Sequence, residues 1–187
     1  KRSCMKANGV AYVTKEAIQK HIPSYARIHG EDKNHFETYY SSITLSDAAF
    51  ASEPRRYQKN KKCTIALSDV AMNNDRKGES VFLKVVHNAR KLGYEVSAIL
   101  IGDGSMRKQY EQMCKEMEID NYVRFTGLFP SADLVREELK KADLFLFPTK
   151  AEGLPRGVLE AMALGLPVLS TPVGGIPEVL PQSCMFE

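Results

Sequence analysis

Short apolar runs alternate with amphipathic helical patterns through the middle and end of the chain. Between residues 63 and 170 the order is strand then helix, repeated until a fifth strand closes the series. Parallel strands need crossover connections, so this order predicts an α/β fold with one doubly wound parallel sheet, Rossmann-like, covered by helices on both faces. The predicted strands are residues 63–67, 96–101, 123–126, 144–147 and 168–170.

Two of the connecting segments have a clear helical period. Apolar residues recur at helical spacing from Val81 to Leu92, and Gly93 follows as a stop signal. Methionines and one tyrosine form a second stripe, which we expect to pack in the core because such stripes rarely bind cofactors. Its members are Met106, Tyr110, Met113 and Met117.

The first 60 residues begin with one predicted strand and one predicted helix, and the regular spacing of apolar residues then ends. A strand is predicted at residues 11–13 and a helix at 15–21 with Thr14 as its N-cap, whereas residues 39–45 are the one strand candidate that follows. We therefore expect three parts. Residues 1–36 are the tail of a preceding domain, 37–60 cross to the next domain, and 61–187 form the sheet domain, truncated at its C-terminus.

Composition agrees with a packed chain and excludes several classes. The 187 residues suit one compact domain carrying pieces of another, and 43% apolar with 26% charged residues argues against disorder. A net charge of +3 is too balanced to make nucleic acid the main partner. The apolar runs are far shorter than the roughly 20 residues that a membrane span needs.

The cysteines and histidines do not form a metal motif. The four cysteines are far apart with no C-x-x-C pair, and the four histidines are scattered. We expect reduced thiols, a cytoplasmic setting and no metal. Because the chain begins at Lys1 without a methionine or a leader sequence, we also expect it to be a fragment of a longer protein.

The most informative segment runs from residue 147 to residue 178. A strand ends near Phe147, a loop carries Glu152, and a helix begins near Arg156 and ends at Gly165, so that Glu160 lies about one turn into it. In a doubly wound sheet this loop lies at the carboxyl edge, where helix N–H groups attract a diphosphate. Two carboxylates beside it would need sugar hydroxyls as partners. The segment therefore predicts a nucleotide-sugar pocket.

This segment closely resembles the E-x7-E signature of family 4 (group 1) glycosyltransferases with the GT-B fold, followed by the EAMALGLPV and STPVGGIPE runs that accompany it. The resemblance covers about residues 61–182, which would correspond to the family's C-terminal, donor-binding domain. Residues 12–14 before a helix look like the end of the acceptor domain. Upstream matches in the family's order are Lys77-Gly78, residues 101–104, residues 123–127, residues 142–144 and residues 147–149.

The resemblance implies roles for individual residues. Glu152 would orient the donor sugar and Lys77 would neutralise the leaving diphosphate, which makes these two the catalytic candidates. Glu160 would bind the ribose hydroxyls, and residues 125–127 would lie along the base. The implied donor-binding residues are Glu160, Gly153, Leu154, Pro155, Arg156, Arg76, Phe125, Thr126 and Gly127.

The sequence departs from the family in two places. Where the family often has an arginine a few residues before the lysine, this chain has residues 67–70, Leu-Ser-Asp-Val, so Arg76 or Arg156 would have to supply the charge. Asp69 is unfavourable beside a diphosphate. Pro155 removes one N–H from the phosphate cradle, although proline suits the first turn of a helix.

The resemblance thus implies a fragment of a retaining glycosyltransferase with no cofactor. Its substrate would be a UDP- or GDP-linked sugar, and its acceptor a glycan or lipid-linked hydroxyl bound through a missing domain. The setting is cytoplasmic, with at most peripheral association at the inner face of the plasma membrane. Alone, the fragment is expected to bind nucleotide weakly and to transfer nothing. Two alternatives stay open, a nucleotide-sugar epimerase of similar fold and a non-catalytic nucleotide-sugar binding module.

Overall fold

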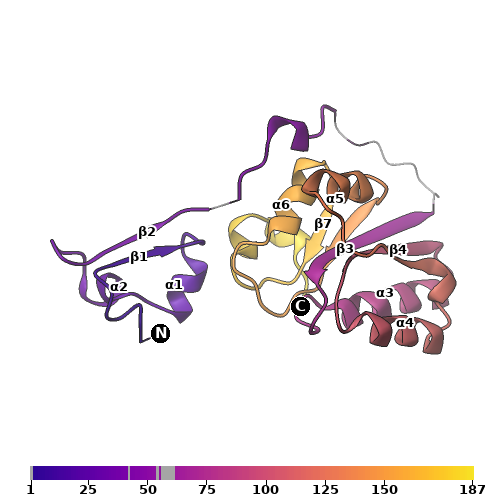
Figure 1. Cartoon of the computed structure of the whole chain (residues 1–187), viewed down its shortest axis with the longest axis horizontal. Coiled ribbons are helices and arrows are strands. Elements are labelled where there is room, and N and C mark those ends of the chain that lie inside the picture. Colours follow the sequence, from indigo (N-terminus) through magenta and orange to yellow (C-terminus); the bar gives the residue numbers. More distant parts are fainter. Residues whose placement is uncertain (1, 42, 54, 56–61) are drawn as a thin grey trace.

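The computed structural model describes residues 2–41, 43–53, 55 and 62–187. Its main body is a five-stranded sheet in the order β5-β4-β3-β6-β7, in which all neighbouring strands are parallel (Figure 1). The predicted doubly wound α/β fold is confirmed. The strands are β3 (Cys63–Ala71), β4 (Val96–Asp103), β5 (Val123–Phe125), β6 (Leu144–Phe147) and β7 (Val168–Ser170).

Helices cover both faces of this sheet. α3 and α4 lie together on one face, and α5 and α6 on the other (Figure 1). This follows from right-handed crossovers, because the chain moves outward from β3 in one direction and outward from β6 in the other. The helices are α3 (Glu79–Lys91), α4 (Arg107–Glu116), α5 (Ala132–Leu139) and α6 (Arg156–Ala163), and short 3-10 turns lie at Asp120–Tyr122, Ile176–Glu178 and Gln182–Cys184.

The core lies where the two faces of the sheet meet the helices. Leu67 of β3, Leu100 of β4 and Phe145 of β6 are fully buried, as are Phe82 and Val86 of α3. A strand covered on both faces requires a nearly continuous apolar run, which is why these segments could be recognised in the sequence.

The methionine stripe packs against this core, as predicted. Tyr110 is 1% exposed, and Met106, Met113 and Met117 are partly buried against the core cluster. α4 begins at Arg107, so Met106 precedes the helix.

Two central strands are longer than predicted. β3 continues past Leu67 to Ala71, and β4 reaches Asp103. The predicted strand ends at Leu67, before the polar Ser68 and Asp69. In the structure the pairing of β3 with β4 resumes after an irregularity, with Ala71 beside Asp103. The extension carries the chain further toward the carboxyl edge and brings Asp69 there.

The N-terminal segment forms a second, two-stranded parallel sheet. β1 (Gly9–Tyr12) pairs with β2 (Phe36–Tyr39), and α1 (Ala17–His21) and α2 (Tyr25–His29) lie between them in the sequence (Figure 1). The predicted strand at residues 39–45 is wrong apart from Tyr39. Backbone pairing of β2 along β1 decides its position, and residue 42 lies outside the described residues.

The predicted first helix begins two residues late, and Thr14 is not its N-cap. The Thr14 hydroxyl accepts a hydrogen bond from the Ile18 N–H (3.0 Å) and donates one to the side-chain oxygen of Gln19 (2.9 Å). Glu16 occupies the N-cap position and makes no side-chain capping bond. α2 was not predicted, although Ser24 caps it by accepting from the Arg27 N–H (3.0 Å).

The predicted crossing, residues 37–60, is described in part. It contains a 3-10 turn at Asp47–Ala49, and the Ala51 N–H then donates to the carbonyl of Ala163 at the end of α6 (2.8 Å). Arg55 reaches the backbone carbonyls of Lys140 and Ala142. Residues 42, 54 and 56–60 of the crossing and residue 61, the predicted start of the sheet domain, lie outside the described residues. The three-part division therefore stays a prediction.

In the described part of the chain, each helix is too short or too polar to cross a membrane.

Candidate functional site: a crevice at the centre of the sheet

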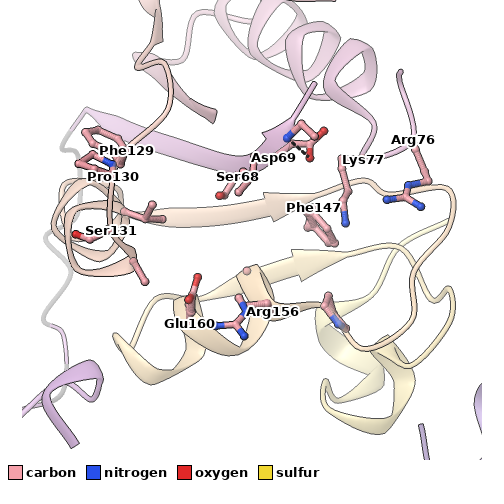
Figure 2. A pocket seen from close by; sticks show the side chains of 16 residues that line it. Ser68, Asp69, Arg76, Lys77, Phe129, Pro130, Ser131, Phe147, Arg156 and Glu160 are labelled. Atoms are coloured by element: carbon pink, nitrogen blue, oxygen red, sulfur yellow. Dashed lines mark hydrogen bonds between the residues drawn. The ribbon is translucent and has the colours of Figure 1, made fainter. Parts of the chain in front are cut away.

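The main cavity lies where the strand order reverses. β3 and β6 are neighbours at the centre of the sheet, but their following elements run to opposite sides. Their loops therefore diverge at the carboxyl edge and leave a crevice, the usual ligand position in this fold. A cavity of about 480 Å³ opens there (Figure 2). Its lining includes Asp69, Lys77, Phe129, Phe147, Arg156 and Glu160.

The loop after β3 is held against the loop after β6. The carbonyl of Arg76 accepts a hydrogen bond from the Lys150 N–H (2.8 Å). Gly78 has a φ of 83°, and a Cβ at this position would lie 2.0 Å from the carbonyl oxygen of Pro148. Only glycine fits both constraints. The Lys77-Gly78 sequence thus fixes where Lys77 leaves the backbone.

Lys77 and Glu152, the two predicted catalytic residues, form an ion pair with each other. The Lys77 ammonium also lies 5.2 Å from the centroid of the Phe147 ring. Their side chains are 18% and 9% exposed, so the pair is mostly shielded from water and the loss of either charge would leave the other uncompensated. The pair joins the loop after β3 to the loop after β6, and of the two residues Lys77 lines the cavity whereas Glu152 is not part of its lining.

Glu160 lies one turn into α6, and Figure 2 shows it beside the cavity together with Arg156. It is 5% exposed, and no described group donates a hydrogen bond to its carboxylate. Burial raises the pKa of Glu160, while Arg156 and Arg136 oppose the rise. The Glu160 oxygens are not among the fully enclosed polar atoms without a partner, so they open to the cavity, where water or the hydroxyl of a ligand can donate to them.

The start of α6 adds positive potential to the same cavity. Pro155 stands at the N-cap without a capping bond, and the first turn has no acidic residue. The first backbone N–H groups of the helix have no partner within it, so they favour an anion. Arg156 and Arg76 also line the cavity, so both arginines lie where the sequence predicts a positive charge beside the diphosphate.

Gly153 and Leu154 do not line the main cavity. The carbonyl of Gly153 accepts from the Gly175 N–H (2.7 Å), and Leu154 borders a second cavity of about 400 Å³ beside Tyr39 and Tyr40. The predicted contact of their N–H groups with the sugar or diphosphate stays a prediction.

Phe125, Thr126 and Gly127 also lie away from the lining of the main cavity. The Arg107 guanidinium lies 5.8 Å from the centroid of the Phe125 ring. The carbonyl of Gly127 accepts hydrogen bonds from the Thr126 hydroxyl and from the Gly102 N–H (3.2 Å). Their predicted contact with the base stays a prediction.

The cavity is bordered on the β5 side by residues that the sequence analysis did not select. These are Phe129, Pro130, Ser131, Ala132 and Val135 (Figure 2). One signal could have found them. Ser131 caps α5 by accepting from the Leu134 N–H, and a cap residue that follows a strand of a parallel sheet lies at the carboxyl edge.

A second carboxyl group stands behind Asp69. Glu79, the first residue of α3, is 0% exposed, and neither of its oxygens has a hydrogen-bond partner among the described residues. Burial, and after it the neighbouring Asp69, raises the pKa of Glu79 to about 8. With a pKa of about 8, Glu79 holds its proton at neutral pH and adds no negative charge beside Asp69. In the described residues, no three His, Cys, Asp or Glu side chains gather as metal ligands would.

Sequence relatives match the sheet domain. The chain is 38% identical over 113 residues to N-acetyl-alpha-D-glucosaminyl L-malate synthase of Bacillus anthracis, a match covering 59% of this chain and 29% of that protein. It is 29% identical over 122 residues to the putative colanic acid biosynthesis glycosyltransferase WcaL of Escherichia coli K12, covering 62% and 30%. The chain thus spans about 30% of the length of these curated relatives.

Solved structures extend the likeness of fold to the N-terminal segment. The pneumococcal O-GlcNAc transferase GtfA, crystallised with UDP and GlcNAc, superposes with a TM-score of 0.70 at 15% identity, covering 95% of this chain and 33% of that one. At this identity the likeness concerns the fold alone.

The family model described as "Glycosyl transferases group 1" matches residues 65–185. This range holds all five strands of the main sheet except the first residues of β3, together with Lys77 and both glutamates of E-x7-E. It covers well over half of the chain. The chain therefore belongs to the group 1 glycosyltransferases.

Proposed function

We propose that this chain is the donor-binding part of a retaining glycosyltransferase and that the crevice holds a nucleoside diphosphate sugar. The observation that carries the proposal is Glu160. A buried carboxylate beside the cavity, without a donor among the described residues, matches the hydroxyl groups of a ribose. The diphosphate would then lie at the start of α6, where Arg156 and free N–H groups balance its charge.

Lys77 would bind the diphosphate, and Glu152 would orient the sugar. In the absence of ligand they neutralise each other. A bound diphosphate competes for the Lys77 ammonium, which would release the Glu152 carboxylate toward the sugar. During transfer the bond from the anomeric carbon to the diphosphate oxygen breaks and its electron pair stays on the diphosphate. Lys77 and the two arginines stabilise that charge. The oxygen of the acceptor hydroxyl forms the new bond to the same carbon, and its proton passes to the leaving diphosphate.

Phe129 and Pro130 border the cavity and offer an apolar surface for a base, whereas residues 125–127, expected from the family resemblance, are not part of its lining. The acceptor would be a glycan or lipid-linked hydroxyl bound partly by segments of a longer protein. The likeness to WcaL, a putative colanic acid biosynthesis glycosyltransferase, and to GtfA crystallised with UDP and GlcNAc supports polysaccharide biosynthesis and a nucleotide-sugar donor. We place the reaction in the cytoplasm, with at most peripheral contact to the membrane.

A non-catalytic binding module is the second candidate, and Asp69 is the observation that favours it. Asp69 lines the cavity in the stretch where the family often has an arginine, although the residue is 9% exposed and its carboxylate accepts a hydrogen bond from the Ala71 N–H (3.2 Å). Such a module would bind nucleotide sugar without turning it over.

The test is product analysis with a longer protein that contains this chain. The protein is incubated with UDP- and GDP-linked sugars, with and without oligosaccharide acceptors, and the anomeric proton couplings of the products are followed by NMR. Transfer with retained configuration is the expected result. A new epimer formed from donor alone would replace the proposal with the epimerase, and binding without any product would leave the module. The present chain alone is expected to bind nucleotide and to transfer nothing.

A further inference from the structure

Glu178 receives three hydrogen bonds from a distant part of the chain. Its carboxylate accepts from the backbone N–H groups of Lys15 (2.7 Å), Glu16 (2.8 Å) and Ala17 (2.7 Å). The local sequence offers these groups no other cap, because Glu16 makes no capping bond and the first turn of α1 has no acidic residue. A residue about 160 positions away thus completes the backbone at the start of α1.

The turn at residues 174–178, which carries Glu178, also supports the loop at residues 152–154, which we call the donor loop. Gly174 has a φ of 59°, and a Cβ there would lie 2.0 Å from the carbonyl oxygen of Glu152. The Gly175 N–H donates to the carbonyl of Gly153 (2.7 Å). The backbone that carries Glu152 therefore rests directly on the two glycines that precede Glu178 by three and four residues.

The N-terminal segment reaches the same place from the other side. Thr14 is 1% exposed, and its methyl group would lie 2.7 Å from a Cβ at Gly175. Val13 would lie 3.3 Å from a Cβ at Gly153. In Figure 1, α1 accordingly lies beside the yellow loops at the C-terminal end of the chain. Residues 13–17, the turn 174–178 and the loop 152–154 meet in one three-way contact.

We propose that Glu178 is a positioning residue that couples the N-terminal segment to the donor loop, so that residues 13–17 and 152–154 are held or released together. Glu178 does not line the main cavity and acts through Gly174 and Gly175. Burial would raise the pKa of Glu178, but the N–H groups of Lys15, Glu16 and Ala17 outweigh it and the pKa is lowered, which agrees with a carboxylate that stays charged in this contact. The functional part of the inference rests on the proposed donor site, because loop 152–154 carries Glu152.

Hydrogen–deuterium exchange of the present chain tests the coupling without any ligand. In Glu178→Ala, peptides covering residues 13–20 are expected to exchange at least tenfold faster, and peptides covering residues 150–156 and 173–177 several-fold faster. Glu178→Gln keeps one acceptor oxygen and should recover part of the protection. Glu95→Ala is the control and should change neither region, because Glu95 is exposed and its side chain forms no hydrogen bond or ion pair with the described residues.

Two results separate the possibilities. Faster exchange confined to residues 13–20 in Glu178→Ala would overturn the coupling, since Glu178 would then cap α1 and do nothing more. Calorimetric titration with UDP and GDP adds the functional reading, in which Glu178→Ala binds 3- to 10-fold more weakly than wild type and Glu178→Gln lies between them. Absence of nucleotide binding in the wild-type chain would count against the donor site, whereas the exchange pattern would still decide on the coupling.

Discussion

The crevice is bordered by two strand–helix units, β6 with α6 and β3 with α3, and each contributes a buried glutamate near the start of its helix. Glu160 of α6 is 5% exposed and borders the cavity, with Arg156 and Arg136 close enough to influence its pKa. Glu79 of α3 is 0% exposed and faces Asp69 and Asp75 instead.

The difference lies in what can satisfy each carboxyl group. Glu160 has Arg156 and Arg136 nearby, which oppose the rise that burial causes in its pKa, and it borders the cavity, so its carboxyl group can accept hydrogen bonds from a ligand. Glu79 is surrounded by Asp69, Asp75 and the hydroxyl of Tyr110, which donates to Asp75 (3.3 Å), so it keeps its proton. Similar placement in the fold therefore gives one candidate binding group and one group that only moderates charge.

The largest expected effect comes from the ion pair that links the two halves. Lys77→Ala should lower the free energy of unfolding by about 4 kcal/mol, because it leaves the mostly buried Glu152 carboxylate without its partner. Urea unfolding measures this loss. Lys150→Ala is the matched control, since that lysine is 57% exposed in its pair with Asp75 and should cost at most about 1 kcal/mol. Equal losses in the two variants would mean that the Lys77 pair is effectively solvated.

A smaller effect is expected from the glycine under the β6–α6 loop. Gly174→Ala meets both a positive φ and the carbonyl of Glu152, whereas Gly93→Ala at a φ of 88° has nothing within 4 Å. Both pay the conformational strain, so the excess loss in Gly174→Ala, about 2 kcal/mol, reports the clash alone. Thermal unfolding of both variants gives the difference. Indistinguishable melting temperatures would show that the donor loop moves away freely.

The smallest expected effect concerns pH and the β3–α3 half. Between the ordinary pKa of 4.5 and the folded value of about 8, Glu79 holds a proton in the folded chain that it loses on unfolding. Stability should therefore fall as pH rises through this window. Glu79→Gln removes that decline but leaves a buried amide without partners, so its net gain in stability over wild type at pH 8.5 should be about 1 kcal/mol. Unfolding curves from pH 4 to 9, with Glu95→Gln as control, measure it. An unchanged slope in Glu79→Gln would mean that Glu79 is ionised.

The β6–α6 half could be predicted from the sequence because its information is local. Strand, loop, helix start and glycine stop follow one another within residues 144–165, so the position of Glu160 one turn into α6 is set by short-range signals. The Lys77–Glu152 pair is different. It spans 75 residues, and the resemblance to a family grouped the two residues without showing that they contact each other.

The β3–α3 half and the N-terminal segment show why the rest could not be predicted. Glu79 appears in the sequence as an ordinary acidic residue at a helix start, and only the extension of β3 to Ala71 brings Asp69 against it. Likewise, β2 was expected at residues 39–45 because apolar residues cluster there, but pairing with β1 fixes it at Phe36–Tyr39. Long-range backbone pairing overrides local composition in both regions.

Calorimetric titration of the present chain with UDP, GDP and ADP, on wild type, Glu160→Gln and Glu79→Gln, tests the central claim most directly. Both variants keep the shape of the side chain and remove one carboxyl group, that of Glu160 from the lining of the crevice and that of Glu79 from the buried site behind Asp69. The account predicts that one nucleotide binds, that Glu160→Gln weakens it by roughly 1–3 kcal/mol, as expected for lost bonds to a charged group, and that Glu79→Gln leaves the affinity nearly unchanged. Equal effects in the two variants, or a loss confined to Glu79→Gln, would contradict it.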